Sequence, residues 1–192
     1  MAVILETDRL ILRVPIQADF DAGWAEFHTD PECMRYLGGA MARSVAWRAL
    51  ATVAGSWPLL GFGPFCAIEK ATGLWMGRVG PWRPDGWPAP EVGWLFHKRA
   101  WGKGYATEAA NACLEFVFDT LGWPMVGHMI HPENAASIAV ARRVGSRFLE
   151  IVTLPPPMDV AGPTQMWGQT AEDWRAAQSA ASGPLKSPAS NT

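Results

Sequence analysis

The sequence predicts a single domain of mixed α/β (α+β) class. The chain has 192 residues, which is within the usual length of one domain. Apolar residues make up 49% of it, enough for a sizeable core. Short apolar runs bounded by Gly and Pro alternate with longer segments at helical spacing. This mixture indicates strands and helices combined throughout one fold.

The N-terminal third is expected to contain one strand and two helices. Residues 9–14 alternate polar and apolar side chains at the ends of the run, which is typical of a strand. Pro15 then opens a helical pattern that places three aromatic residues on one face. Ser44 is a suitable N-cap for a second helix, which we expect to run to about residue 54.

The middle of the chain predicts three strands. Residues 65–69 and 74–79 are apolar runs separated by a short turn, as in a hairpin. Residues 81–90 form a proline-rich loop, because proline cannot donate a hydrogen bond to a strand ladder. Residues 91–96, with the sequence EVGWLF, are the next strand.

The strongest helical pattern covers residues 105–121, where small and apolar side chains recur at helical spacing. Further segments are a strand at 125–130, a helix at 134–144, strands at 148–154 and 165–169, and a short helix at about 170–180. The domain is expected to span residues 1–178. Residues 179–192 are small, polar and proline-bearing, so we expect a disordered tail there.

Charge and cysteine content exclude several classes of partner. The net charge of −2 gives no reason to expect nucleic acid or an anionic membrane as a partner. No stretch reaches the roughly 20 apolar residues of a membrane-spanning helix. The three cysteines show no metal-ligand spacing, so no metal is expected, and their pattern fits a reducing cytoplasm.

A cationic, glycine-spaced turn follows the EVGWLF strand, in the sequence HKRAWGKGYATE. Arg99 and Lys103 bring positive charge, while Gly102 and Gly104 let the backbone turn tightly and approach a ligand. The helix that begins near Tyr105 points its first free N–H groups back into the turn, with the positive end of its dipole. Together these features are typical of a phosphate site.

The glycine spacing by itself leaves an ordinary strand-to-helix turn open as the alternative. Two nucleotide-binding motifs do not fit the letters. A P-loop requires Ser or Thr after its lysine, whereas Gly104 follows Lys103 here. A dinucleotide fingerprint requires a third glycine, and Thr107 occupies that position.

The wider spacing carries a family resemblance. Arg99-x-x-Gly102-x-Gly104 resembles the [Q/R]xxGx[G/A] pyrophosphate motif of the GNAT acetyltransferases. EVGWLF and WGKGYATEA together look like the RimJ/RimL branch, which acetylates protein N-termini and, in many relatives, small amines. Residues 134–148, NAASIAVARRVGSRF, are similar to that branch's NxxSxxVxxxxGF element, although Ser146 and Arg147 depart from it. The resemblance covers roughly residues 6–170.

The resemblance implies a fold and a cosubstrate. The fold would be a central mixed, mostly antiparallel twisted sheet of about six or seven strands, splayed between strands 4 and 5 and flanked by helices. The cosubstrate would be acetyl-CoA, held at its pyrophosphate by the turn and along its pantetheine arm by the fourth strand. The cofactor-binding residues would be Trp94, Leu95, Phe96, Arg99, Trp101, Gly102, Lys103, Gly104, Tyr105, Ala106, Thr107 and Asn134.

The resemblance also implies direct attack of a primary amine on the thioester, with no covalent enzyme intermediate. Glu91 matches the position of a general base, although a strand-end glutamate is also common. Ser137 matches a proposed donor to the departing thiolate, with water as the alternative. Asn134 is equally a good N-cap. A strand N–H group, that of Leu95, would polarise the thioester carbonyl.

Two functions are therefore weighed. The first is an acetyl-CoA-dependent N-acetyltransferase; the second is a non-catalytic acyl-CoA-binding module, which Glu91, Asn134 and Ser137 argue against. The amine acceptor is open. The acceptor loops should be residues 15–54 and 155–165, with Phe62, Phe65, Trp82 and Trp87 as candidates for an apolar wall. Members of this branch are often dimers, and the apolar surface permits a homodimer, so the oligomeric state is open.

Overall fold

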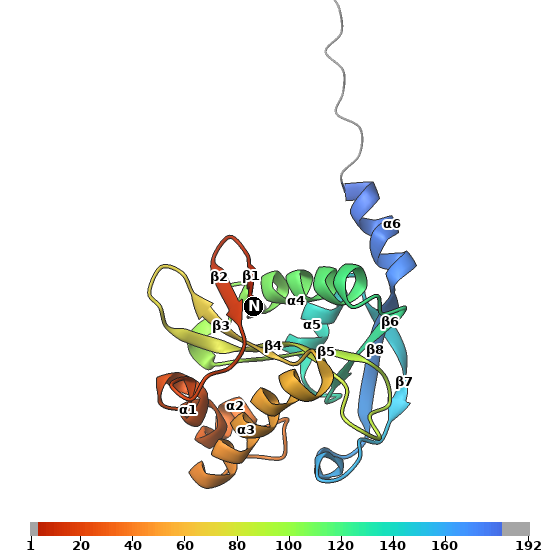
Figure 1. Cartoon of the computed structure of the whole chain (residues 1–192). Helices are drawn as coiled ribbons and strands as arrows, with labels where there is room; N and C mark the ends of the chain where they lie inside the picture. The colour runs from red at the N-terminus through yellow and green to blue at the C-terminus, as the bar shows by residue number, and fades with distance from the viewer. Residues whose placement is uncertain (1–3, 182–192) are drawn as a thin grey trace, which may run out of the picture.

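The protein is a single eight-stranded sheet covered by helices on both faces, as seen in the computed structural model, which describes residues 4–181 (Figure 1). The strand order is β1-β2-β3-β4-β5-β6-β8-β7. The strands are β1 (Ile4–Glu6), β2 (Leu10–Arg13), β3 (Phe65–Glu69), β4 (Trp75–Trp82), β5 (Glu91–Phe96), β6 (Met125–Ile130), β7 (Arg147–Val152) and β8 (Thr164–Thr170).

The helices lie in two groups. The main ones are α1 (Ala25–Thr29), α2 (Pro31–Met34), α3 (Arg43–Leu60), α4 (Tyr105–Glu115), α5 (Ala135–Arg143) and α6 (Ala171–Ala181). Short irregular helical turns are η1 (Phe20–Trp24), η2 (Lys98–Ala100), η3 (Phe116–Thr120) and η4 (Met158–Ala161). Figure 1 shows α4 and α5 on one side of the sheet and α1, α2 and α3 on the other.

Each face of the sheet has its own apolar core. One core packs Val92, Trp94 and Phe96 of β5 against α4 and α5. The other packs Trp24 and Phe27 against the opposite face, together with Leu95 of the same strand. Alternate residues of β5 therefore belong to opposite cores, as the two-residue period of a strand requires.

The sheet separates between β5 and β6. All other neighbouring strands pair antiparallel over several residues, whereas β5 and β6 run parallel and share the single pair Glu91↔Gly127. These two strands are the fourth and fifth predicted from the sequence, so the expected splay is confirmed. The sheet has one strand more than the six or seven expected, because the three-residue β1 on the edge beside β2 is too short to show a period.

Some helix boundaries also differ from the expectation. α3 continues to Leu60 and ends where Gly61 adopts a left-handed conformation, with φ +78°. Helical structure near the N-terminus begins only at Phe20 and is interrupted before α2. α6 includes residues 179–181, which we expected in the tail; the rest of the expected tail lies outside the described residues. No helix within residues 4–181 is both long and apolar enough to span a bilayer.

Candidate active site

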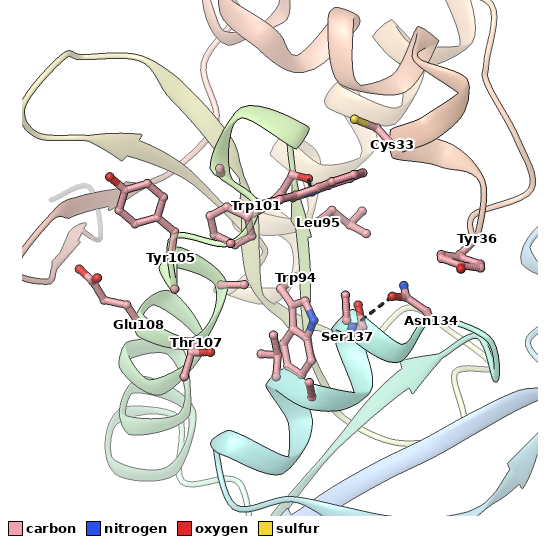
Figure 2. Close-up of a pocket in the computed structure, with 18 of the residues that line it drawn as sticks. Cys33, Tyr36, Trp94, Leu95, Trp101, Tyr105, Thr107, Glu108, Asn134 and Ser137 are labelled. Carbon is pink, nitrogen blue, oxygen red and sulfur yellow. Dashed lines mark hydrogen bonds between the residues drawn. The ribbon is translucent and has the colours of Figure 1, made fainter.

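A cavity of about 830 Å³ opens beside the C-terminal half of β5 (Figure 2). Its walls come from β5, the turn before α4, the first turns of α4 and α5, and the α1–α2 segment. Most of the residues predicted to bind the cofactor line it: Trp94, Leu95, Phe96, Trp101, Gly102, Gly104, Tyr105, Ala106, Thr107 and Asn134. Ser137 lines it as well. The structure therefore brings together segments that lie more than a hundred residues apart in the sequence, such as those of Phe27 and Ser137.

The turn before α4 presents main-chain N–H groups to this cavity. Gly102 and Gly104 have φ of +71° and +79°, which other residues rarely adopt. In the described part of the chain, no protein acceptor faces the N–H groups of residues 102–107; the first helical bond is from Glu108 N to Gly104 O. A Cβ built on Gly102 would meet nothing within 4 Å, so there is room for a ligand. This geometry is suited to bind an anion, and the turn is called the cradle below.

Arg9 supports the cradle from behind, a contact that sequence reasoning did not anticipate. Its Nη1 donates to the carbonyl oxygen of Lys103 at 2.9 Å, and its Nε donates to Glu108 Oε2 at 2.6 Å. The guanidinium also lies 4.3 Å from the centre of the Tyr105 ring. Since Glu108 and Tyr105 belong to the first turn of α4, Arg9 joins the turn and the helix start into one unit.

The register of β5 decides which main-chain groups face the splay. His97 N donates to Met76 O at 2.8 Å, and Leu95 pairs with Arg78 in the same ladder. In an antiparallel pair the hydrogen-bonded residues alternate, so Leu95 directs its N–H toward β4. Trp94 and Phe96 therefore turn their main-chain groups toward β6. The expectation that the Leu95 N–H polarises a thioester was wrong, because this N–H points toward β4 and away from the splay. The position of Leu95 in the strand is clear from the sequence, but the register of its pairing is not.

His128 of β6 holds the splayed strands together below Trp94. Its Nδ1 lies 2.6 Å from Val92 O and its Nε2 2.9 Å from Ser146 Oγ. Burial lowers the pKa of His128 to about 4, so the ring is neutral. The ring also packs 4.7 Å from that of Trp94. Ser146, one of the two departures from the family element, thus completes a buried hydrogen-bond network.

Asn134 and Ser137 lie together at the start of α5 (Figure 2). Asn134 Oδ1 accepts a hydrogen bond from Ser137 N at 3.1 Å, so Asn134 caps the helix. Its side-chain NH₂ remains free to donate to another group. The Ser137 hydroxyl makes no hydrogen bond to the described residues, so it is available to a ligand.

Glu91 lies at the closed end of the splay and outside the cavity lining. It is 7% exposed, and its carboxylate accepts hydrogen bonds from Trp87 Nε1 at 2.7 Å and from Met129 N at 3.2 Å. Burial is the main cause that raises the pKa of Glu91 to about 7, against these hydrogen bonds, which favour the charged form. The carboxyl can therefore exchange a proton near neutral pH.

Two predicted cofactor-binding side chains do not line the cavity. Arg99 forms an ion pair with Glu26 of α1, and its Nε donates to His97 Nδ1 at 3.0 Å. Its guanidinium thus fastens α1 to the loop after β5. Lys103 contributes its carbonyl to Arg9, and its side chain is exposed. The main-chain N–H groups expected to hold the pyrophosphate line the cavity, whereas the side chains of these two cations, expected to add contacts, do not.

The α1–α2 segment, which lies within residues 15–54 expected to form an acceptor loop, supplies a further wall of the cavity. Cys33, Arg35 and Tyr36 line the cavity, and Figure 2 shows Cys33 and Tyr36 there. The Tyr36 ring packs 5.1 Å from that of His131. Phe62 and Phe65 instead pack inside the core against Trp123 and Trp57, so the apolar wall expected from them is not formed there. No cluster of metal ligands occurs among residues 4–181.

The fold and this cavity are suited to a nucleotide thioester, because free N–H groups lie at a helix start and one strand is left free to pair with an extended arm. Comparison with known proteins agrees. Residues 9–147 match the family model "Acetyltransferase (GNAT) domain". The chain therefore belongs to the GNAT acetyltransferase family, whose members use acetyl-CoA, and it is an N-acetyltransferase.

Individual relatives show the same fold. The uncharacterised protein YkkB of Bacillus subtilis is 30% identical over 150 residues, covering 77% of this chain and 87% of that protein. The crystal structure of an acetyltransferase from Agrobacterium tumefaciens is 29% identical with a TM-score of 0.76, covering 87% of this chain and 94% of the other. The aminoglycoside acetyltransferase AAC(6')-Ib in complex with coenzyme A has a TM-score of 0.71 at 20% identity, covering 88% and 99%.

Proposed function

We propose that the chain moves the acetyl group of acetyl-CoA to a primary amine by direct attack of the amine on the thioester. The observation that carries this proposal is the continuous path from the free N–H groups of residues 102–107 to the main chain of Trp94 and Phe96. A diphosphate at the first and an extended amide arm along the second would place a thioester at the splay. The RimJ/RimL-like letters EVGWLF and WGKGYATEA support the same placement.

The main-chain cradle is suited to bind the diphosphate, and Trp101 helps to fix its shape. The Trp101 indole Nε1 donates to Phe96 O at 2.7 Å, which ties the turn to the end of β5. Thr107 adds a hydroxyl in the first turn of α4. Asn134 adds a side-chain amide on the facing helix. On this proposal Arg99 and Lys103 do not contact the diphosphate. Their positive charges near the turn attract it, and Lys103 O anchors the turn to Arg9.

Proton transfer is assigned to Glu91 and Ser137. An ammonium has no lone pair, so the amine must lose a proton before or during attack, and Glu91 with a pKa of about 7 can receive it. Because Glu91 does not line the cavity, a water molecule carries that proton. When the carbon–sulfur bond breaks, the Ser137 hydroxyl protonates the leaving thiolate and recovers its proton from solvent.

A thiol-release assay tests the proposal. Purified protein is given acetyl-CoA and a panel of primary amines, and free thiol is followed with a chromogenic reagent. Amine-dependent thiol release together with the acetylated amine in the mass spectrum is expected. Tight CoA binding with no release on any amine would overturn the proposal in favour of an acyl-CoA-binding module. A cytoplasmic location stays a prediction, and a homodimer stays open.

A further inference from the structure

Arg78 of β4 is a half-buried cation that the reaction outlined above does not use. It lies in the centre of the sheet, in one cross-strand row with Arg13 and Cys66 on one side and Leu95 on the other. Leu95 packs in the core on the α1–α3 face, so the Arg78 side chain lies on that face too. Its guanidinium carbon is 5.6 Å from the centre of the Trp24 ring.

No protein group satisfies this guanidinium within the described residues. The Nε atom is inaccessible to solvent and has no hydrogen-bond partner. No carboxylate oxygen of residues 4–181 lies within the 4.0 Å of an ion pair. Arg13 lies two strands away in the same row and, unlike Arg78, has a carboxylate partner. Its two Nη atoms donate to Asp19 at 2.7 and 2.8 Å. One arginine of the row is fully paired and the other is not.

A half-buried cation with an inaccessible and unsatisfied Nε lowers the stability of the fold. Burial lowers the pKa of Arg78 to about 10 even though the Glu91 charge favours the protonated form. The group therefore stays charged at neutral pH, at a cost that the Glu91 charge and the Trp24 ring offset only in part. Charges removed from water in proteins are normally paired or bind a ligand, so an anion from outside the chain would be a suitable partner for this guanidinium.

The position of Arg78 limits which anion this can be. Its cross-strand partner Leu95 lines the cavity and lies between Trp94 and Phe96, whose main chain faces the splay. Arg78 itself does not line the cavity, so an anion that reaches it would extend from the cavity past Leu95, on the α1–α3 face of the sheet. An acceptor whose amine reaches the thioester beside Trp94 and Phe96 while its anionic group reaches Arg78 needs these two groups close together. A fork of two N–H donors fits a carboxylate well.

We propose that the acceptor is a small amine that bears a carboxylate, of the α-amino acid type, and that Arg78 binds the carboxylate. This inference rests on the proposed acetyl transfer and names its substrate class. The acceptor end of the cavity agrees with it, because Arg35 stands there over the Tyr36 ring without an ion-pair partner among the described residues. A polycationic acceptor would meet two arginines.

The test compares amines that differ only in the carboxylate. Thiol release from acetyl-CoA is measured with an α-amino acid, its primary amide and its decarboxylated amine, for one aromatic, one aliphatic and one polar side chain. For at least one set, kcat/KM for the acid should exceed that for the amide by about 10- to 100-fold, the usual worth of a charge-assisted hydrogen bond. Equal or better use of the amides throughout would overturn the inference while leaving acetyl transfer intact. Thiol release with none of the amines would instead count against the proposed function.

Three variants separate binding from structure. Arg78→Met should bring the acid-to-amide ratio toward one, and its Tm should equal or exceed that of the wild type, because an unpaired, half-buried charge is removed. Arg13→Met is the matched control. It should lower Tm, because the Asp19 carboxylate loses its ion-pair partner, and should leave the acid-to-amide ratio of kcat/KM unchanged. Arg35→Gln tests the cavity mouth and should change the ratio less than Arg78→Met does.

Several outcomes contradict the inference. It fails if the ratio persists in Arg78→Met, or if Arg35→Gln abolishes the ratio while Arg78→Met does not. A Tm of Arg78→Met as low as that of Arg13→Met would assign Arg78 to structure. If Arg78→Met does not fold, Arg78→Lys keeps the charge but loses the fork, and should reduce the ratio without abolishing it; an unchanged ratio there would also count against the carboxylate fork.

Discussion

The carboxylate of Glu91 accepts a hydrogen bond from the main-chain N–H of Met129, 3.2 Å away, at the point where β5 and β6 separate. A side chain on one strand thus satisfies a backbone donor that the missing ladder would otherwise leave unpaired. The same contact gives Glu91 two roles, closing the splay and holding a proton. These roles can be separated by experiment.

Replacement of Glu91 by Gln should change the pH dependence of the rate. As a base Glu91 must be ionised, so wild-type kcat/KM should rise with pH through an apparent pKa near 7. The Glu91→Gln variant should be slower by about 100-fold or more and should lack this acidic limb. Rate profiles from pH 5.5 to 9 check this. A variant profile that keeps the limb would assign the limb to another group and Glu91 to structure alone.

The same carboxyl should make stability fall with rising pH. Its pKa is higher in the folded chain than the ordinary 4.5, so the folded state binds the proton more tightly than the unfolded state does. The contribution is fully present below pH 4.5 and is lost as pH rises through about 7, by about 3 kcal/mol in all. Chemical unfolding of wild type and Glu91→Gln over this range should show that difference. Parallel curves for the two proteins would contradict it.

Gly102→Asp should abolish most CoA affinity. A carboxylate there would repel the diphosphate, and the left-handed φ of +71° would strain the backbone. Gly73 offers a matched control, since it has the same φ of +71°, equally free space, and a place in the β3–β4 turn away from the cavity. Calorimetry should show at least a tenfold higher Kd for CoA with Gly102→Asp and no change with Gly73→Asp. Equal Kd values for CoA in the two variants would show that the diphosphate does not bind at the turn of residues 102–107.

Arg9→Gln should weaken acetyl-CoA binding with a small effect on the chemical step. Loss of the bonds to Lys103 O and Glu108 would loosen the cradle, so KM for acetyl-CoA should rise several-fold while kcat changes little. Arg43→Gln removes the exposed ion pair with Asp21, remote from the cavity, and should change neither constant. A fall in kcat alone for Arg9→Gln would argue against a positioning role.

Ser137→Ala and Tyr36→Phe together identify the group that protonates the thiolate. Both hydroxyls belong to cavity-lining residues, but Ser137 stands on the helix start that faces β5. We expect Ser137→Ala to lower kcat by 10-fold or more at constant KM for acetyl-CoA, and Tyr36→Phe to change kcat by less than about twofold. The reverse pattern would transfer the role to Tyr36.

Much of the fold follows from short-range patterns in the sequence. The long helix at 105–121 and the strand at 91–96 show clear periods, and the turn between them carries its glycines at fixed spacing. The separation of β5 and β6 was expected from the resemblance to the GNAT family and from no local pattern. By contrast, β1 is too short to show a period, and η1 is interrupted by the non-helical conformation of Gly23. Gly23 lies so close to Trp75 that a Cβ there would meet it at 2.7 Å, and no local pattern predicts this tertiary contact.

The parts of the site that the sequence misplaced all depend on partners distant in the chain. Arg99 was expected at the diphosphate, but Glu26, 73 residues earlier, pairs with it. The N–H of Leu95 was expected to face the thioester, but its pairing with Arg78 of β4 directs that N–H away from the splay. The isolation of Arg78 follows from which carboxylates are absent around it, and no local pattern records that.

A structure of the protein with CoA bound tests the central claim most directly. The account predicts diphosphate oxygens within about 2.7–3.2 Å of N–H groups of residues 102–107, and a pantetheine arm that bonds the main chain of Trp94 and Phe96. A diphosphate bound elsewhere, or an arm paired with Leu95, would contradict the account.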